Sequence, residues 1–394
     1  MRQEHSAAGT RRVLVHGAGI GGLTAAVALA RLGIEVDVVE LRAADSAPGV
    51  GLIQPSNALG ALATLGLRDA CLAAGFSFEE LHIRSPDGRL TTAIPPPVSG
   101  YGPPSHNAIS RARLSAVLTG AALRSGARIH YGATITELVE DPATVTVTAS
   151  ALEPDADDSP VLQGCYDLVL GFDGIRSPLR THLYGSSYEP ELTGQAVWRA
   201  SVPRPAEVDR VIMSSAGDRK AVLTPIDAST MYIALVVPAP GNPWMDRQRL
   251  PQLFHEQLVE AGFGGTVGAV ADTVKSSRTV AYTPLEQVTV AEPWFRGRIA
   301  IAGDAAHATV PQLAQGAAMA VEDAVVLGES LREHPVLGAA LTAWYERRRP
   351  RAAFVQDFSR ALLRQESGLE LSSAEAVLMG IGIPGAQARL AEPY

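Results

Sequence analysis

The sequence predicts an α/β protein in which a parallel-sheet domain is interrupted by an antiparallel β-sheet domain and followed by C-terminal helices. An apolar run, Val13 to His16, leads directly into a glycine-rich turn and a helix, as in a Rossmann-like unit. Residues 196–237 contain β-rich runs separated by Pro and Gly, a pattern typical of an antiparallel sheet. A chain of 394 residues is long enough for both parts.

The glycines of the first turn have separate tasks. Gly17 allows the tight turn, Gly19 lets the backbone approach a pyrophosphate, and Gly22 lets the helix pack closely on the sheet. Glu40 closes the next apolar run and lies 18 residues after Gly22. This is close to the offset of roughly 20 residues at which a carboxylate meets the ribose hydroxyls of a dinucleotide. The arrangement predicts a site for the ADP half of a dinucleotide, with the phosphates at the helix N-terminus.

The remaining elements follow from apolar periodicity and from capping and turn residues. Ser110 can cap one helix, and Pro350 is expected to start or kink a helix near the end of the chain. The acidic residues 153–160 are expected to form an exposed turn. We expect helices at 23–32, 56–67, 110–125, 251–261 and 315–331, and strands at 128–131, 144–149, 166–172, 196–202, 208–214, 221–225, 231–237 and 298–302.

This order of elements predicts a discontinuous layout. The nucleotide-binding domain is expected to comprise residues 11–75, 101–180 and 285–345, and the substrate-binding sheet domain residues 76–100 and 181–284. Residues 346–394 are expected to form the C-terminal helices. A ligand cleft is expected where the two domains meet.

Composition excludes several functions. A net charge of −8 argues against a nucleic-acid surface, and the basic run Arg347 to Arg351 is interpreted as a solvated helix face. Two cysteines, Cys71 and Cys165, without a CxxC pair or a His cluster give no reason to expect a metal site or a disulfide framework. The polar N-terminus and the lack of a long apolar stretch predict a cytoplasmic protein without a membrane span.

Three stretches together resemble the class A flavoprotein monooxygenases, the aromatic hydroxylases related to para-hydroxybenzoate hydroxylase. They are Gly17 to Gly22 with Glu40, residues 167–177 around Asp173-Gly174, and Gly303-Asp304-Ala-Ala-His307. Further similarity runs through residues 49–67, the helix that contains Arg111, and residues 315–324, so the likeness spans about 11–350. The resemblance implies the FAD-binding domain of these hydroxylases, with an inserted substrate-binding sheet.

The resemblance also implies which residues hold FAD. Asp304 is expected to accept hydrogen bonds from the ribityl chain, and the helix start at Gly316, Ala317 and Ala318 is expected to face the pyrimidine end of the flavin. Arg111 is expected near the phosphate or ribityl side, and Asp173 near the pyrophosphate. The remaining expected contacts with the cofactor come from Gly17, Gly19, Gly22, Glu40 and Arg42.

The chain departs from the family pattern at two places. Family members commonly read Gly-Gln-Gly followed two positions later by Asn, whereas this chain has Ala314-Gln315-Gly316 and Ala318. Backbone contacts would survive this change, but a contact through the Asn side chain would not. Many smaller relatives also carry a Tyr before the proline of the third sheet strand, where Thr224 precedes Pro225 here. A phenol that helps to deprotonate the substrate is therefore not evident at that position.

The activity implied by the resemblance is the hydroxylation of a small aromatic or heteroaromatic substrate. NADH or NADPH would reduce FAD, and oxygen would then add at C4a to give the hydroperoxyflavin that attacks the ring. Pro311 is expected close to the flavin ring, and the pocket wall is expected to include Trp198, Arg199, Arg219 and Thr224 from the sheet. Each of these four can equally be ordinary core or surface of that sheet.

Other functions remain open at this point. The same flavin chemistry serves epoxidation or Baeyer–Villiger oxidation in secondary metabolism. A protein that holds FAD and a ligand without turnover, or an oxidase that uses no nicotinamide, would also fit. In each case we expect a small-molecule ligand, no nucleic acid, no membrane, and a monomer or homodimer.

Overall fold

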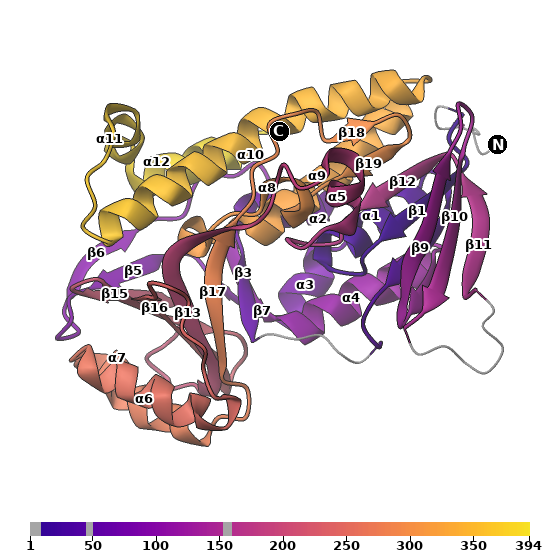
Figure 1. Cartoon of the computed structure of the whole chain (residues 1–394). Helices are drawn as coiled ribbons and strands as arrows, with labels where there is room; N and C mark the ends of the chain where they lie inside the picture. Colours follow the sequence, from indigo (N-terminus) through magenta and orange to yellow (C-terminus); the bar gives the residue numbers. More distant parts are fainter. Residues whose placement is uncertain (1–8, 45–49, 153–159) are drawn as a thin grey trace.

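The computed structural model describes residues 9–44, 50–152 and 160–394. Its larger domain is built on a six-stranded sheet with the order β18-β19-β12-β1-β2-β8, in which all neighbours are parallel except the β18–β19 pair (Figure 1). The strands are β1 (Arg12–His16), β2 (Glu35–Glu40), β8 (Arg128–Tyr131), β12 (Leu168–Gly171), β18 (Phe295–Arg296) and β19 (Ile299–Ile301). The expected strands at 128–131 and 298–302 are confirmed.

The central strands of this sheet are buried on both faces. Val13, Leu14 and Val15 of β1 are fully buried, as a continuous apolar strand of a parallel sheet should be. One face is covered by helices that pack on one another: α1 (Ile20–Ala30), α4 (Arg111–Arg124) and α9 (Gly316–Glu333). Ser110 caps α4 by accepting a hydrogen bond from the Arg113 amide, which confirms the expected cap.

The second domain is a seven-stranded sheet with the order β17-β13-β16-β15-β14-β5-β6. Its strands are β5 (Leu81–Arg84), β6 (Leu90–Ile94), β13 (Glu191–Pro203), β14 (Val211–Ala216), β15 (Arg219–Pro225), β16 (Thr230–Pro238) and β17 (Ala281–Gln287). The expected antiparallel sheet is therefore present, but β14 pairs with β5 in parallel. Residues 81–94 join strands that lie more than a hundred residues further along the chain.

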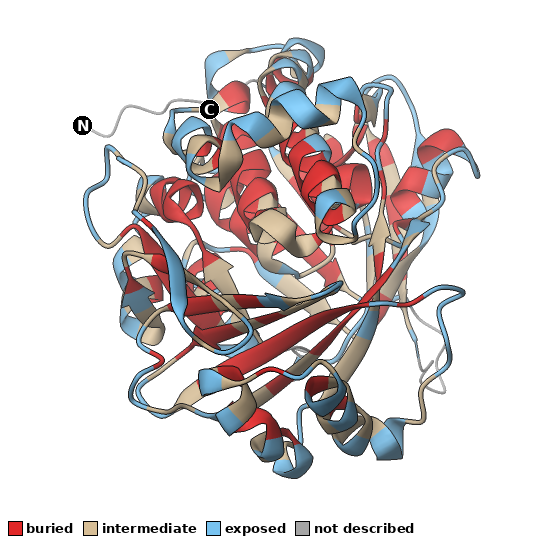
Figure 2. Ribbon diagram, turned by 90° about the vertical axis from the view of Figure 1, so that its left-hand side faces the viewer, coloured by how far each residue is buried: buried red, intermediate tan, exposed pale blue. Residues whose placement is uncertain are grey.

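The two faces of the second sheet pack against different partners. Ala196, Trp198, Leu223 and Ile233 face α6 (Leu250–Glu260) and α7 (Gly265–Val270), which lie under the sheet in Figure 1. Val197, Val236 and Tyr232 share the opposite face with Ala108 of the larger domain. The central strands β15 and β16 are mostly buried, whereas β6 at the edge is mostly exposed; Figure 2 shows both buried and exposed stretches in this part of the molecule. The face that carries Val197, Tyr232 and Val236 therefore lies at the boundary between the two domains.

Two three-stranded sheets complete the architecture. One, ordered β3-β7-β4, lies between the larger domain and the second sheet, and the other, ordered β11-β10-β9, lies beside the parallel sheet (Figure 1). Their strands are β3 (Gly51–Gln54), β4 (Phe76–Phe78), β7 (His106–Ser110), β9 (Ala133–Glu140), β10 (Val145–Ala151) and β11 (Leu162–Tyr166). The remaining helices are α2 (Ser56–Thr64), α3 (Arg68–Ala74), α5 (Pro178–Tyr184), α8 (Asp304–His307), α10 (Leu337–Glu366), α11 (Ser373–Gly380) and α12 (Gly382–Ala391).

Some expectations about single elements need correction. Pro350 does not start a helix, because it lies inside α10, which runs from Leu337 to Glu366. The short helix α7 was not expected. The expected turn at 153–160 falls outside the described residues apart from Pro160, which is exposed. None of the helices in the described ranges combines the length and the apolar composition needed to cross a bilayer.

Candidate cofactor and substrate site

The glycines in the turn after β1 serve two different purposes: two of them are needed for packing, and one borders open space. Gly17 has φ +104°, and a Cβ on Gly22 would lie 1.9 Å from the Gly17 carbonyl oxygen. These two glycines are therefore required by the packing of the turn on α1. A Cβ on Gly19, in contrast, would meet no atom within 4 Å. The space beside Gly19 is open, on the side where the first amides of α1 have no side-chain cap.

Glu40 lies at the end of β2 beside this turn. One oxygen of its carboxylate accepts a hydrogen bond from the Ala18 amide at 2.7 Å, and the other accepts one from the Arg42 amide at 2.8 Å. Because Glu40 is only half-buried, its remaining lone pairs can accept from ribose hydroxyls. The Arg42 side chain is exposed next to it.

Asp173 follows β12 and carries a free acceptor. Its Oδ2 accepts a hydrogen bond from the Leu179 amide at 3.1 Å and lies 3.4 Å from Nδ1 of His16. Its Oδ1 is buried and has no hydrogen-bond partner among the described residues. An orphaned buried acceptor requires a donor, and a bound ligand can supply one.

Asp304 lies at the start of α8, after Gly303 with its φ of +57°. Its side chain is exposed to solvent yet surrounded by protein, which places it in a recess rather than on a convex surface. This surrounding raises the pKa of Asp304, and the nearby His307 and Arg111 lower it. A Cβ on Gly316 would lie 3.9 Å from Oδ1 of Asp304. The segment expected at the ribityl chain and the segment expected at the pyrimidine are therefore adjacent.

The first turn of α9 is available to a ligand. Gln315, the residue before the helix, makes no side-chain hydrogen bond to the free amides. Ala314 has φ +55°, in the left-handed region that favours Gly. Ala318 is buried. Beside it is a small apolar cavity lined by residues of α1, α2, α4, β3 and α9: Ile20, Leu52, Ile53, Gln54, Ala58, Leu62, Leu114, Leu118, Ala317, Ala318 and Val321.

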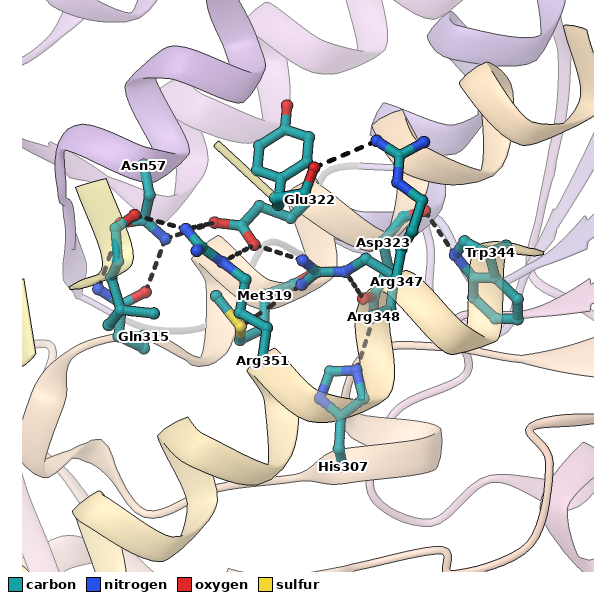
Figure 3. Close-up of polar contacts among 12 residues, drawn as sticks. Asn57, His307, Gln315, Met319, Glu322, Asp323, Trp344, Arg347, Arg348 and Arg351 are labelled. Carbon is teal, nitrogen blue, oxygen red and sulfur yellow. Dashed lines mark hydrogen bonds and ion pairs between the residues drawn. The ribbon is translucent and has the colours of Figure 1, made fainter. Parts of the chain in front are cut away.

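Behind this turn, α9 carries two fully buried carboxylates, Glu322 and Asp323. Both bind Arg348 of α10, which is also fully buried, with Nη1 to Glu322 at 2.5 Å and Nε to Asp323 at 2.7 Å (Figure 3). Arg351 adds a second contact to Glu322, at 2.8 Å. The interpretation of residues 347–351 as a solvated face is therefore wrong for Arg348 and Arg351.

His307, at the end of α8, also joins this network. Its Nε2 lies 2.6 Å from Oδ2 of Asp323, and its ring packs against Trp294. Burial by itself raises the pKa of Asp323, but His307 and Arg348 lower that pKa to about 2. Asp323 is thus an ionised carboxylate at any physiological pH.

On the interdomain face of the second sheet, Thr224 and Tyr232 are cross-strand partners. Both are buried, and the Tyr232 ring packs on Gly51 of β3, where a Cβ would lie only 2.8 Å from the ring. Burial raises the pKa of Tyr232, whereas Thr224, Arg199 and Arg111 lower it. A phenol is therefore present beside Thr224, although it comes from the neighbouring strand.

Arg199 lies near this phenol. It is half-buried, and in the described ranges its guanidinium makes neither an ion pair nor a hydrogen bond. Burial lowers its pKa, and Tyr232 raises it. Arg111, at the start of α4, acts electrostatically on Arg199, Tyr232 and Asp304. Arg111 is therefore close to Asp304 and also to the Arg199–Tyr232 pair.

Two expected pocket residues are placed elsewhere. Trp198 packs on Phe254 of α6, with 5.7 Å between ring centroids. Arg219 forms an ion pair with Glu260 of α6 at 3.1 Å. Both lie on the face turned away from the larger domain, so the expectation that they line the pocket is corrected. Pro311 is half-buried in the short turn between α8 and α9.

These features fit an ADP-linked flavin. The open space at Gly19, the orphaned oxygen of Asp173, the accessible Asp304 and the uncapped amides of α1 and α9 are groups that such a ligand can use. Gly17 lies against Asp173, and Gly316 lies beside Asp304, so these segments are neighbours in pairs. In the same described ranges, no three His, Cys, Asp or Glu side chains are grouped as a metal site.

Comparisons with known proteins agree with this geometry. A model of the FAD binding domain family matches residues 10–359. YetM of Bacillus subtilis (strain 168), named as a candidate FAD-dependent monooxygenase, is 33% identical over 93% of this chain and 97% of its own. The 6-hydroxynicotinate 3-monooxygenase of Bordetella bronchiseptica is 30% identical over 89% of this chain and 91% of its own. The structure of Klebsiella pneumoniae HpxO with FAD and uric acid superposes with a TM-score of 0.81 and 25% identity, covering 98% of this chain and 99% of HpxO.

Proposed function

The chain belongs to the FAD binding domain family as an FAD-dependent monooxygenase of the aromatic hydroxylase type, and we propose that it hydroxylates a small acidic aromatic or heteroaromatic compound with NADPH or NADH as reductant. The observation that carries the choice of substrate is the unpaired guanidinium of Arg199 beside the buried phenol of Tyr232. A guanidinium remains charged in proteins, so within the described part of the chain this one lacks an anion.

The residues around the recess would hold FAD. Gly17, Gly19, Gly22, Glu40 and Arg42 belong to the ADP half, and Asp173 and Arg111 to the phosphates. Asp304 would accept from the ribityl chain, while Gly316, Ala317 and Ala318 would present amides to the pyrimidine. When bound, FAD accepts a hydride from the nicotinamide and supplies the oxygen-transfer chemistry.

The chain's own part in the reaction is to orient the substrate and to exclude water. Arg199 would bind the acidic group of the substrate, and Tyr232 would donate a hydrogen bond to the ring oxygen. Both interactions stabilise the ionised ring, which is the electron-rich form that is easier to oxidise. Val197, Val222, Val236 and Val310 supply an apolar surface around these two groups. Such a surface keeps water away from the reacting atoms.

Relatives support the substrate class without fixing the compound. The names of the relatives refer to 6-hydroxynicotinate and uric acid, which are both small acidic heteroaromatics. The phenol of Tyr232 offers a counterpart to the family Tyr that Thr224 replaces. Pro311 would lie beside the flavin ring in this arrangement. Thr224 would line the substrate pocket.

The test is anaerobic stopped-flow mixing of the FAD-loaded protein with NADPH or NADH and a panel of acidic heteroaromatics. We expect the visible absorbance of the oxidised flavin to bleach faster when a true substrate is present. Readmission of labelled oxygen should then give a product that carries one labelled oxygen atom. A protein that binds FAD but is bleached by neither nucleotide across the panel would refute the proposal. A product formed by alkene or carbonyl oxidation would favour the epoxidase or Baeyer–Villiger alternative.

A further inference from the structure

One buried cation connects two cofactor segments that are far apart in the sequence. We propose that Arg348, together with Glu322 and Asp323, positions the flavin by fixing the Gly303–Asp304 turn relative to the first turn of α9. The inference deepens the cofactor side of the proposed function and rests on FAD binding at this site. None of the three side chains is expected to touch the flavin.

The first arm of the network runs through Asp323. Its Oδ2 accepts hydrogen bonds from the Gly303 amide at 2.9 Å and from Nε2 of His307 at 2.6 Å. These two donors lie on either side of Asp304, the residue expected at the ribityl chain. Since the other oxygen binds Arg348, the carboxylate is held in a single orientation. The orientation of the turn, and with it the direction of the Asp304 side chain, is therefore set by Asp323.

The second arm runs through Glu322. Its Oε1 accepts a hydrogen bond from Nδ2 of Asn57 on α2 at 2.6 Å. Asn57 also exchanges two hydrogen bonds with the side chain of Gln315, at 2.9 and 3.2 Å. Gln315 immediately precedes the free amides of α9. The Glu322 carboxylate therefore fixes the residue from which the flavin-facing helix starts (Figure 3).

Arg348 makes these two arms one unit, because a guanidinium can bind two carboxylates in a fixed geometry. A buried ionic cluster is a poor source of stability, since well-packed apolar side chains often serve as well or better. The cluster contacts both cofactor segments. A neighbouring ion pair between the same two helices, Arg347 with Glu329 at 2.7 Å, contacts neither segment. This pair provides a matched control.

The experiment compares Arg348→Lys, Asp323→Asn and the control Glu329→Gln with the wild-type holoenzyme. The Kd of FAD is measured by titrating the apoprotein, and the midpoint potential and visible circular dichroism are measured on the loaded protein. We expect Arg348→Lys to raise the Kd by about tenfold or more, the range expected when a charged hydrogen bond is lost. Arg348→Lys should also shift the potential, because lysine cannot hold both carboxylates. Asp323→Asn should weaken FAD binding similarly, while Glu329→Gln leaves the Kd and the potential unchanged.

A second variant keeps the proposal testable if these proteins do not fold. Asn57→Ser removes the link to Gln315 without removing a charge, and we expect it to shift the midpoint potential. If folded Arg348→Lys or Asn57→Ser protein binds FAD with the wild-type Kd, potential and dichroism, the positioning role is refuted. A wild-type protein that binds no FAD would instead refute the proposed function, so the two failures are distinguishable.

Discussion

Thr224 and Tyr232 lie directly opposite each other on β15 and β16, and both side chains are buried on the face that is turned toward the larger domain. The Thr224 hydroxyl lies close enough to the Tyr232 phenol to lower its pKa, whereas burial raises that pKa. A buried phenol is therefore present beside Thr224, contributed by the neighbouring strand.

Replacing this phenol is expected to slow the reaction but not to weaken cofactor binding. Tyr232→Phe should lower kcat/KM for the acidic substrate by about 10- to 100-fold, the effect of losing a hydrogen bond to a charged group. The Kd of FAD should be unchanged. Steady-state kinetics and FAD titration check both values. Tyr282→Phe is the control, because Tyr282 packs on the opposite face of the same sheet. Equal kinetics for the two variants would show that Tyr232 has no role in the reaction.

Substitution of two glycines in the first turn is expected to have different effects, one on FAD binding and the other on stability. Gly19 has φ −73° and ψ −176°, which any residue adopts, and its Cβ would enter open space. Gly19→Ala should therefore fold normally but lose FAD, because the methyl group would occupy the cofactor's space. Gly22→Ala should destabilise the apoprotein by roughly 3 kcal/mol, since its Cβ meets a backbone oxygen. Urea unfolding of the apoproteins and FAD titration separate the two effects. Normal FAD affinity in Gly19→Ala would show that the cofactor does not bind against this turn.

Ala314 is expected to be a removable source of strain. An L-residue other than Gly in the left-handed region costs about 1 kcal/mol, and Ala314 has φ +55°. Ala314→Gly should therefore raise the free energy of unfolding by about 1 kcal/mol, as measured in urea. The same change in a regular helix should have the opposite sign. Ala376→Gly, at an exposed position of α11, should lower stability by about 1 kcal/mol. A loss of stability in Ala314→Gly would contradict the assigned backbone conformation.

His106 is expected to make stability fall in mild acid. Its ring is buried against Phe78, neither nitrogen has a partner in the described ranges, and burial lowers its pKa to about 4. The unfolded chain then binds a proton below about pH 6.5, whereas the folded chain does so only near pH 4. Stability should therefore fall by about 1.4 kcal/mol per pH unit as the pH drops through this window.

The variant His106→Phe should remove this slope and keep the stacking on Phe78. Urea unfolding at several pH values between 7 and about 4 measures it. His182→Gln is the control, because His182 is exposed and its replacement should leave the slope as it is. A slope that persists in His106→Phe would assign the acid sensitivity to another group.

Local sequence was sufficient to predict the glycine turn after β1 and the elements around it. The roles of Gly17 and Gly22, the strands that flank them and the cap of α4 each depend on residues within one turn or one βαβ unit. Such patterns can be recognised in a sequence because the backbone geometry of a turn or a helix end requires particular residues. The family resemblance added Asp173 and Asp304, which single patterns do not identify.

Distant contacts could not be predicted in this way. Arg348 is buried only because residues 322 and 323 meet it across two helices, and the run of arginines carries no sign of this. The sequence also does not show which face of a strand lines the pocket. Neighbouring residues such as Arg219 and Lys220 point to opposite faces of the sheet, and either face could be the one toward the cofactor domain. One signal was available: Arg219 has the same parity as Ala221 and Leu223, which are apolar. Parity separates the two faces, but it does not say which of them meets the cofactor domain.

The parallel pairing of β14 with β5 limits how this protein can be divided. A fragment made of residues 181–287 would lack β5 and β6, so β14 would become a bare edge with unpaired amides and carbonyls. Exposed edges of this kind recruit other strands and promote aggregation. The inserted sheet is therefore not a transferable module by itself, and chimeras that exchange it between relatives must also carry residues 81–94.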